Sequence, residues 1–354
     1  MHFIPKKMIA AYCEGSDKAV FNLLKYSKVP IDVVYLVDYA IPDAERERLC
    51  GLKPDLIFTD NIMEALSTDG DTLLWTREVF VSEADYKNWQ KILCLAAEHK
   101  KNIYNLARLI QVKDNPLVKY AIRQNNVTYF DASSYALHMS EIIPFGDYPP
   151  GVTNAKVALI LGMERRCGKF TTTQVIHNRL TQRGFQVAEV ATEPYGLLTD
   201  ADYVIIPQIM PMWRATPAVR HIVSHLDKTL RPDIILVSSQ SGVRASALDA
   251  AGRCGGIIAH TIALGAIPDV CILSVPFHSI SLAAKERTFL EFLLEKPVAG
   301  MAIKGLDQSR ERVAQTMSEL RADLKIPVFD PIRDPNTIDE LIDSLVDLIK
   351  ESGE

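Results

Sequence analysis

The sequence predicts an α/β protein built from two doubly wound domains, and three observations carry this prediction. Short apolar runs rich in β-branched residues alternate with segments of helical periodicity, which is typical of parallel sheets covered by helices. Prolines and glycines cluster at residues 144–151, as they do in an interdomain linker. The chain has 354 residues, enough for two cores. We therefore expect domains at 1–145 and 146–354.

The first domain is expected to have a Rossmann-like layout, because short strand patterns alternate with helical ones. Its predicted strands are 8–12, 31–37, 56–58, 72–75 and 127–130, and its predicted helices are 17–26, 61–66 and 84–99. The turn after the first strand, Glu14-Gly15-Ser16, contains one glycine and not the GxGxxG pattern of dinucleotide-binding proteins. The sequence therefore does not favour NAD in this half.

The second domain repeats the alternation on a larger scale. Its predicted strands are 157–161, 186–190, 203–206, 234–237, 270–275 and 298–303. Its predicted helices are 171–183, 217–228, 285–294, 310–324 and 336–350, the last with apolar residues along one face. This order of elements again predicts a parallel sheet.

The segment from Gly162 to Thr173 is the strongest functional signal. It lies between an apolar strand pattern and a helical one, and it contains two glycines and a lysine. Glycines let the backbone approach an anion, and the N–H groups of a helix N-terminus together with the lysine attract it. The expected phosphate-binding residues are Gly162, Arg165, Gly168, Lys169, Thr171 and Thr172. The loop is one residue longer than GxxxxGK[ST], and in this it resembles that of dethiobiotin synthetase.

The loop departs from the common pattern at Phe170, which stands where serine or threonine usually follows the lysine. A phenyl ring cannot bind magnesium, so Thr171 or Thr172 would have to do so. The cofactor expected from this segment is ATP, with magnesium as an open question.

Further candidates follow the predicted strands, because ligands of doubly wound sheets bind at the carboxyl ends of the strands. The candidate substrate-binding or catalytic residues at such places are Glu164, Thr192, Glu193, Gln240, Ser241 and His278, and Arg220 of the helix predicted at 217–228 is a further candidate. His221 and His225 have a spacing that can bind metal on a helix, but no third ligand accompanies them, and we expect surface histidines. No metal-ligand set is identified.

Composition limits the class of protein and of partner. The chain is 48% hydrophobic and 23% charged with a net charge of −5, which is ordinary for a soluble globular protein and favours neither nucleic acid nor a membrane as partner. Six cysteines without a CxxC pair read as reduced thiols of a cytoplasmic protein. We expect a small-molecule substrate and a homo-oligomer.

Several short motifs carry a resemblance that extends over nearly the whole chain. They are Leu23-Leu24-Lys25-Tyr26-Ser27, Asp71-Thr72-Leu73-Leu74, the loop from Gly162 to Thr172, Val190-Ala191-Thr192 with Gly196, Gln240 with Gly242, and Ile267-Pro268-Asp269. With these motifs the chain resembles the DgcN-like family, long catalogued as a domain of unknown function and named for a D-glutamate N-acetyltransferase. The resemblance implies an N-terminal Rossmann-like domain, a C-terminal P-loop NTPase-like domain and acetyl-CoA as cofactor.

The chain also departs from that family at positions where the family has acidic residues. The family usually has a glutamate where Ser238 stands, and it tends to have an acidic residue where Arg220 stands. Its Gly-Gln-Thr-Gly segment is Glu193-Pro194-Tyr195-Gly196 here. The loss of carboxylates suited to magnesium binding or general-base catalysis indicates a different substrate. The acids that would take their role are Glu164, Glu193 and Asp200.

Three functions remain open at this point. The first is an enzyme that uses ATP to activate or modify a small amino acid or carboxylate. The second is an acetyl-CoA-dependent amino-acid N-acetyltransferase, as the resemblance implies. The third is a non-catalytic regulator that responds to a nucleotide.

Overall fold

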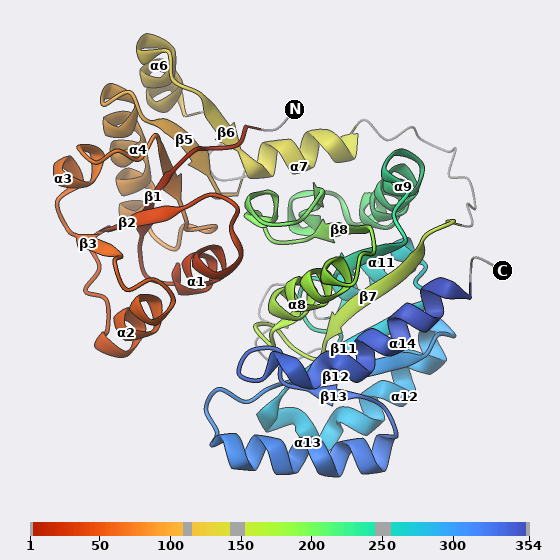
Figure 1. The fold of residues 1–354 in the computed structure, drawn as a ribbon. Coiled ribbons are helices and arrows are strands. Elements are labelled where there is room, and N and C mark those ends of the chain that lie inside the picture. The colour runs from red at the N-terminus through yellow and green to blue at the C-terminus, as the bar shows by residue number, and fades with distance from the viewer. Residues whose placement is uncertain (1–2, 109–114, 142–152, 245–255, 352–354) are drawn as a thin grey trace. The chain divides into compact units, whose positions relative to one another are not determined.

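The computed structural model describes residues 3–108, 115–141, 153–244 and 256–351, which form two compact units (Figure 1). The first unit comprises Met1–Met139 with Pro194–Asp200, and the second comprises Ser140–Glu193 with Ala201–Glu354. Each contains one parallel sheet covered by helices, so the predicted fold class is confirmed. The proline- and glycine-rich cluster at 144–151 lies outside the described residues, and the predicted boundary there stays a prediction.

The sheet of the first unit has six parallel strands in the order β3-β2-β1-β4-β5-β6. These are β1 (Met8–Tyr12), β2 (Ile31–Leu36), β3 (Ile57–Thr59), β4 (Thr72–Trp75), β5 (Asn102–Asn105) and β6 (Tyr129–Asp131). Ile9 of β1 lies opposite Val33 of β2 and Leu73 of β4. The chain therefore winds outward from β1 in both directions, which is the Rossmann strand order.

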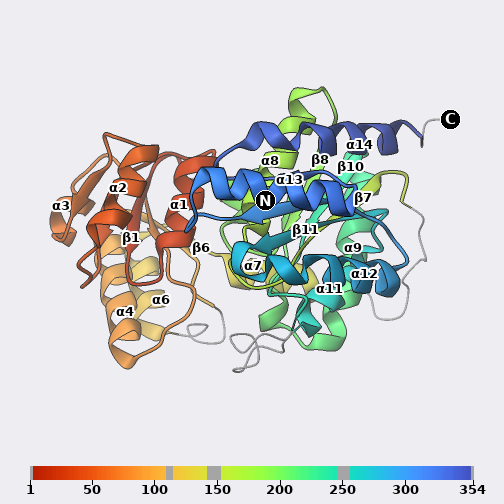
Figure 2. The ribbon, with the colours of Figure 1, turned by 90° about the horizontal axis from the view of Figure 1, so that it is seen from below.

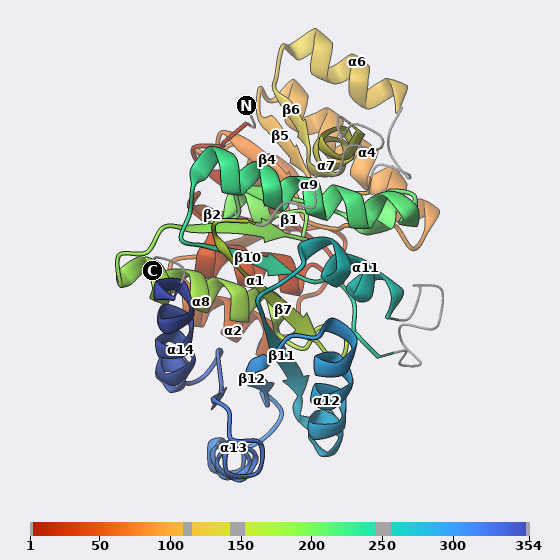
Figure 3. The ribbon, with the colours of Figure 1, turned by 90° about the vertical axis from the view of Figure 1, so that its right-hand side faces the viewer.

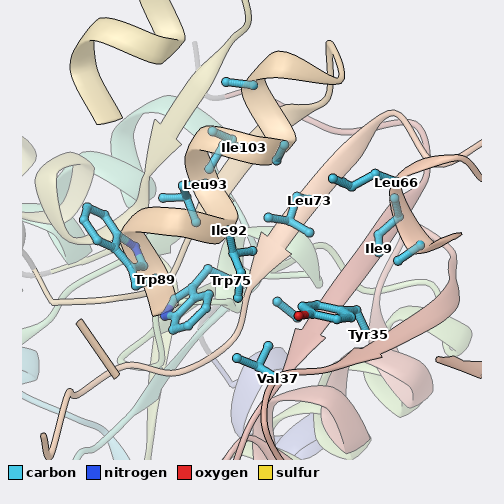
Figure 4. Close-up of a cluster of buried hydrophobic side chains, with 14 of the residues drawn as sticks. Ile9, Tyr35, Val37, Leu66, Leu73, Trp75, Trp89, Ile92, Leu93 and Ile103 are labelled. Carbon is cyan, nitrogen blue, oxygen red and sulfur yellow. The ribbon is translucent and has the colours of Figure 1, made fainter. Parts of the chain in front are cut away.

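Helices cover both faces of this sheet. The helices in this part of the chain are α1 (Asp17–Tyr26), α2 (Asp43–Leu52), α3 (Ile62–Leu66), α4 (Glu83–Glu98) and α6 (Pro116–Asn125), and α7 (Ala132–Glu141) follows β6. Figure 2 shows α1 and α2 on one side of β1, with α4 and α6 on the other. The core beneath α4 packs Trp75, Trp89 and Leu93 against the aliphatic side chains of the sheet (Figure 4). Two tryptophans exposed by no more than 1% anchor this layer.

The sheet of the second unit has seven parallel strands in the order β13-β12-β11-β7-β10-β8-β9. These are β7 (Lys156–Gly162), β8 (Val187–Ala191), β9 (Tyr203–Val204), β10 (Ile234–Ser238), β11 (Val270–Pro276), β12 (Val298–Lys304) and β13 (Val328–Phe329). The central strand β7 pairs with β10 on one side and β11 on the other. Strands following β7 in sequence lie on both sides of it, so its carboxyl end is a point where the winding reverses.

The helices of the second unit separate onto the two faces of this sheet. They are α8 (Lys169–Gln182), α9 (Met212–Leu230), α11 (Ile257–Ala266), α12 (Ala283–Leu294), α13 (Arg310–Leu324) and α14 (Asp339–Lys350). Figure 3 shows α8 and α14 on one side of the strands, and α11 and α12 on the other. Ile176 of α8 and Leu341 and Leu345 of α14 are fully or almost fully buried against the strands. This packing fixes the start of α8 beside the carboxyl end of β7.

Several elements differ from their prediction. The sequence patterns do not predict α2, β5, α6, α7, α11 or β13. Helix α2 buries Leu49 alone, and α11 is apolar on nearly all sides, so neither has a clear helical period. Helix α9 begins at Met212 and contains Pro217, where the prediction had placed its first residue. Within the described ranges, no helix combines the length and apolarity that a membrane span requires.

One short segment belongs to a unit that its position in the chain does not suggest. Residues 194–200 follow β8 of the second unit but make their contacts with the first. Asn22 donates its side-chain amide to the Tyr195 hydroxyl at 2.9 Å, and the Lys28 backbone N–H donates to the Leu198 carbonyl at 3.0 Å. Asp200, one of the acids considered above, pairs with Lys28 at 3.0 Å. The first unit is therefore completed by a distant part of the chain.

Candidate functional site

The predicted phosphate loop lies at the carboxyl end of β7, the central strand of the second unit. The Met163 N–H donates to the Ser274 carbonyl of β11 at 2.9 Å, and the Val243 N–H donates to the Gly162 carbonyl at 2.8 Å. These bonds hold the first residues of the loop between β11 and the segment that follows β10. A Cβ atom at Gly162 would lie 2.4 Å from the Cys167 sulfur, so the fold of the loop requires glycine here.

The N-terminus of α8 is available to an anion. Its N-cap is Gly168, whose φ of 98° lies in the left-handed region and whose lack of a side chain leaves the first turn uncapped. The unsatisfied N–H groups of a first helical turn attract negative charge. The loop and helix thus form the strand–loop–helix geometry that binds phosphate.

Lys169 is the charged group of this site, and it is 8% exposed. Its Nζ donates to the Ser241 carbonyl at 2.7 Å and to the Glu164 carbonyl at 3.2 Å. Both acceptors are neutral backbone groups, so no carboxylate neutralises the ammonium through these bonds. The structure therefore joins Ser241, Glu164 and Lys169, which the sequence analysis had proposed separately.

Glu164 extends from the loop toward the segment that follows β11. Its Oε2 lies 3.0 Å from His278 Nε2, and its Oε1 accepts a hydrogen bond from the Ser279 hydroxyl at 2.6 Å. Burial raises the pKa of Glu164, but the hydrogen bonds from Ser279 and His278 outweigh it, and the net shift is downward. The arrangement holds an ionised carboxylate at the edge of the phosphate loop.

On the other side of the loop, polar groups gather at the ends of β8 and β10. The Gln240 side-chain amide donates to the Thr192 carbonyl at 3.1 Å, and the Thr192 hydroxyl donates to the Ser239 carbonyl at 3.3 Å. Among the described residues, Ser239 Oγ and Gln240 Oε1 are buried with no hydrogen-bond partner. Buried polar atoms normally have partners, so these two are fitted to receive a ligand or water.

Some of the remaining predicted residues lie in the loop or at the start of α8, and others lie on other elements. Arg165 is half-buried in the loop, and Thr171 is buried in the first turn of α8. The Thr172 hydroxyl lies 3.4 Å from that of Ser274, and Glu193 follows β8 directly after Thr192. Arg220 lies within α9, which packs on α11, and none of its described contacts reaches the loop.

Three groups at the site were not predicted: Ser274, Ser279 and Lys304. Ser274 lies near the end of β11 and Ser279 follows it, whereas Lys304 ends β12 and donates its Nζ to the Arg166 carbonyl. Their signal was their place at the carboxyl end of a strand, the same rule that selected Gln240 and His278. In the residues that the structure describes, no group of three or more His, Cys, Asp or Glu side chains is arranged to hold a metal ion.

Comparison with known proteins relates this geometry to a family. A family model described as "Domain of unknown function (DUF1611_C) P-loop domain" matches residues 145–342, and a search of curated proteins finds no match. The crystal structure of a DUF1611 family protein from Anabaena variabilis is similar, with 16% identity and a TM-score of 0.77. The match covers 97% of this chain and 99% of that chain, so the two share a fold.

Weaker structural likenesses also occur. A nucleotide-binding protein in complex with ADP from Archaeoglobus fulgidus is 12% identical over 53% of this chain and 86% of that chain, with a TM-score of 0.32. Chloroplast FtsY from Physcomitrella patens is 15% identical over 73% of this chain and 89% of that chain, with a TM-score of 0.33. At such scores neither bears on function. The family match spans more than half of the residues, and the chain therefore belongs to the DUF1611 family, whose C-terminal domain is a P-loop domain.

Proposed function

We propose that the second unit binds the phosphates of ATP at residues 162–172, and that the protein uses ATP to activate or modify a small carboxylate or amino acid. The observation that carries the proposal is the uncapped N-terminus of α8 beside the buried ammonium of Lys169. Phosphoryl transfer depends mainly on positioning and charge neutralisation, which such a loop supplies.

Magnesium would accompany the nucleotide in this reading, and it would neutralise phosphate charge. Phe170 offers no ligand atom and its side chain is 3% exposed. The hydroxyl of Thr171 would hold the ion, because that of Thr172 faces Ser274.

A second candidate is an acetyl-CoA-dependent N-acetyltransferase that acts on an amino acid. Its support is the resemblance to the DgcN-like family, and Ser238, which ends β10 at a place where that family usually has a glutamate, is compatible with it. A loop that binds the phosphates of CoA needs no magnesium, so an acid at this position would be dispensable. The first unit would then take part in binding the second substrate or in assembly.

Isothermal calorimetry tests both candidates. Purified protein is titrated with ATP and magnesium, with ATP and a chelator, and with acetyl-CoA, beside Lys169→Ala. Loss of an ionic hydrogen bond costs about 1.5–3 kcal/mol, so the variant should bind the true ligand about 10- to 100-fold more weakly. Lys285→Ala, which removes an exposed lysine of α12, is the matched control.

The three titrations separate the candidates. Binding of ATP that tightens with magnesium supports the first, and binding of acetyl-CoA without magnesium supports the second. If Lys169→Ala and Lys285→Ala bind every ligand as the wild type does, the phosphate site itself is wrong. A nucleotide that binds without turnover of any amino acid would favour a regulator.

A further inference from the structure

The phosphate loop contains an acid, Glu164, and a negative side chain opposes the binding of an anion. The structure directs this carboxylate toward the segment that follows β11. There it meets His278 Nε2 at 3.0 Å and the Ser279 hydroxyl at 2.6 Å. Two specific partners for one carboxylate indicate that it has a use other than binding phosphate.

These contacts determine which nitrogen of His278 is free. An ionised carboxylate can only accept hydrogen bonds, so the proton of the neutral imidazole must lie on Nε2. Nδ1 then carries the lone pair. The His278 side chain is 67% exposed, whereas that of Glu164 is 16% exposed. The Glu164 carboxylate thus orients the accessible imidazole of His278. The basic nitrogen of that imidazole, Nδ1, does not face the carboxylate.

We propose that Glu164 and His278 form the proton-accepting pair of the phosphate site, and that they deprotonate the amino group of the amino-acid substrate proposed above. This inference rests on the proposed function, since it needs a phosphate-bearing donor at the loop. His278 Nδ1 takes one proton from the ammonium of the substrate, and Glu164 holds the imidazolium that results. The freed electron pair of the nitrogen forms the new bond to the donor's phosphorus or acyl carbon, and the bond to the leaving group breaks with its own pair. The second proton that the nitrogen must lose passes to the leaving group.

Neighbouring charges support this assignment. Asp307 follows β12 and lies within electrostatic reach of His278, so a second carboxylate accompanies Glu164 near the imidazole. Arg244 lies within reach of Glu164 and keeps the carboxylate ionised, while Glu286 pairs with Arg244 at 3.5 Å. Glu164 is therefore the positioning residue and His278 the catalytic base.

The first test needs no reaction. Nitrogen-15 NMR of labelled protein at about pH 8 reports which ring nitrogen of His278 is protonated. The expected result is a proton on Nε2, and a change toward a mixture of tautomers in Glu164→Gln. A proton on Nδ1 in the wild type would overturn the proposal, whether or not ATP or acetyl-CoA binds.

The second test uses turnover. ATP and acetyl-CoA are each offered with pooled L- and D-amino acids, and transfer to the amine is followed. His278→Gln should lower kcat about 10²- to 10⁴-fold with the KM of the donor unchanged, because a general base acts in the transition state. His225→Gln, the same change at an exposed histidine of α9, should have no effect.

The split between kcat and KM separates a base from a structural clamp. Glu164→Gln removes the partner that orients the imidazole, so kcat should fall while the KM of the donor stays unchanged. A clamp would change donor affinity in both variants. Two results would refute the proposal: an unchanged kcat in His278→Gln, or donor binding by the wild type without transfer to any amine. If the wild type does not bind the donor at all, the phosphate site itself is wrong.

Discussion

Gly242→Ala should disrupt the phosphate site through packing alone. A Cβ atom at this position would lie 2.6 Å from the Met163 carbonyl oxygen and 2.7 Å from Glu164 Cα. Both are backbone atoms, and the Met163 N–H is tied to the Ser274 carbonyl at 2.9 Å, so the loop cannot retreat freely. Overpacking of this kind costs about 1–3 kcal/mol, and 2 kcal/mol would lower the Tm of a unit of this size by about 4–8 °C.

Differential scanning calorimetry measures the shift, and hydrogen exchange read by mass spectrometry locates it. Exchange should increase in β10 and in the phosphate loop, and the affinity for the ligand of the loop should fall. Gly51→Ala is the matched control, because a Cβ at this exposed position of α2 would meet no atom within 4 Å. Alanine there should stabilise the first unit by about 0.5–1 kcal/mol. If Gly242→Ala keeps the wild-type Tm and exchange pattern, the close approach is not a constraint.

Three further results are expected. The pKa of Glu164 is lowered from its ordinary value of 4.5, so its contribution to stability is complete above that pH and is lost as the pH falls through the lowered value. Between about pH 6 and about pH 3, the Tm of the wild type should therefore fall further than the Tm of Glu164→Gln. Parallel curves of Tm against pH for the two proteins would contradict the pairing of Glu164 with His278 and Ser279. Burial raises the pKa of Cys271 to about 12, so iodoacetamide at about pH 8 should label Cys50 and leave Cys271 intact in the native protein, as peptide mass spectrometry can show. Ser82→Ala removes the hydroxyl that accepts from the Asp85 N–H at 3.2 Å in the capping box of α4, and urea unfolding should show a loss of about 1 kcal/mol; no loss would mean that the cap is dispensable.

The sequence predicted the site best where its signal was local. Gly162, Gly168 and Lys169 belong to one motif, and the structure places them as a strand–loop–helix unit. Gln240 and His278 were found by a topological rule, because both follow strands of a parallel sheet. The rule could not say that Glu164 turns toward His278, since that pairing joins residues 114 positions apart.

Other features had no local signal. Lys169 is held by the backbone carbonyl of Ser241, and any residue type provides such a carbonyl. Ser279 is one serine among many until β11 brings it to Glu164. Arg220 was proposed from a family pattern alone, and its helix packs against α11. Helix α11 escaped prediction because a helix that is apolar on nearly all sides has no period to read.

The segment 194–200 has a consequence for how the protein is made. The ribosome first synthesises the part of the first unit that ends at Met139. The fully buried Tyr195 and its neighbour Leu198, which complete this unit, are synthesised only about 60 residues later. At about 5–20 residues per second, the nascent first unit waits roughly 3–12 s for its last piece, while β7, α8 and β8 emerge in the interval. Until then Asn22 lacks its tyrosine partner. Synthesis order therefore couples the maturation of the Rossmann-like unit to the start of the P-loop unit, and a chain stopped at residue 145 would remain an unfinished domain.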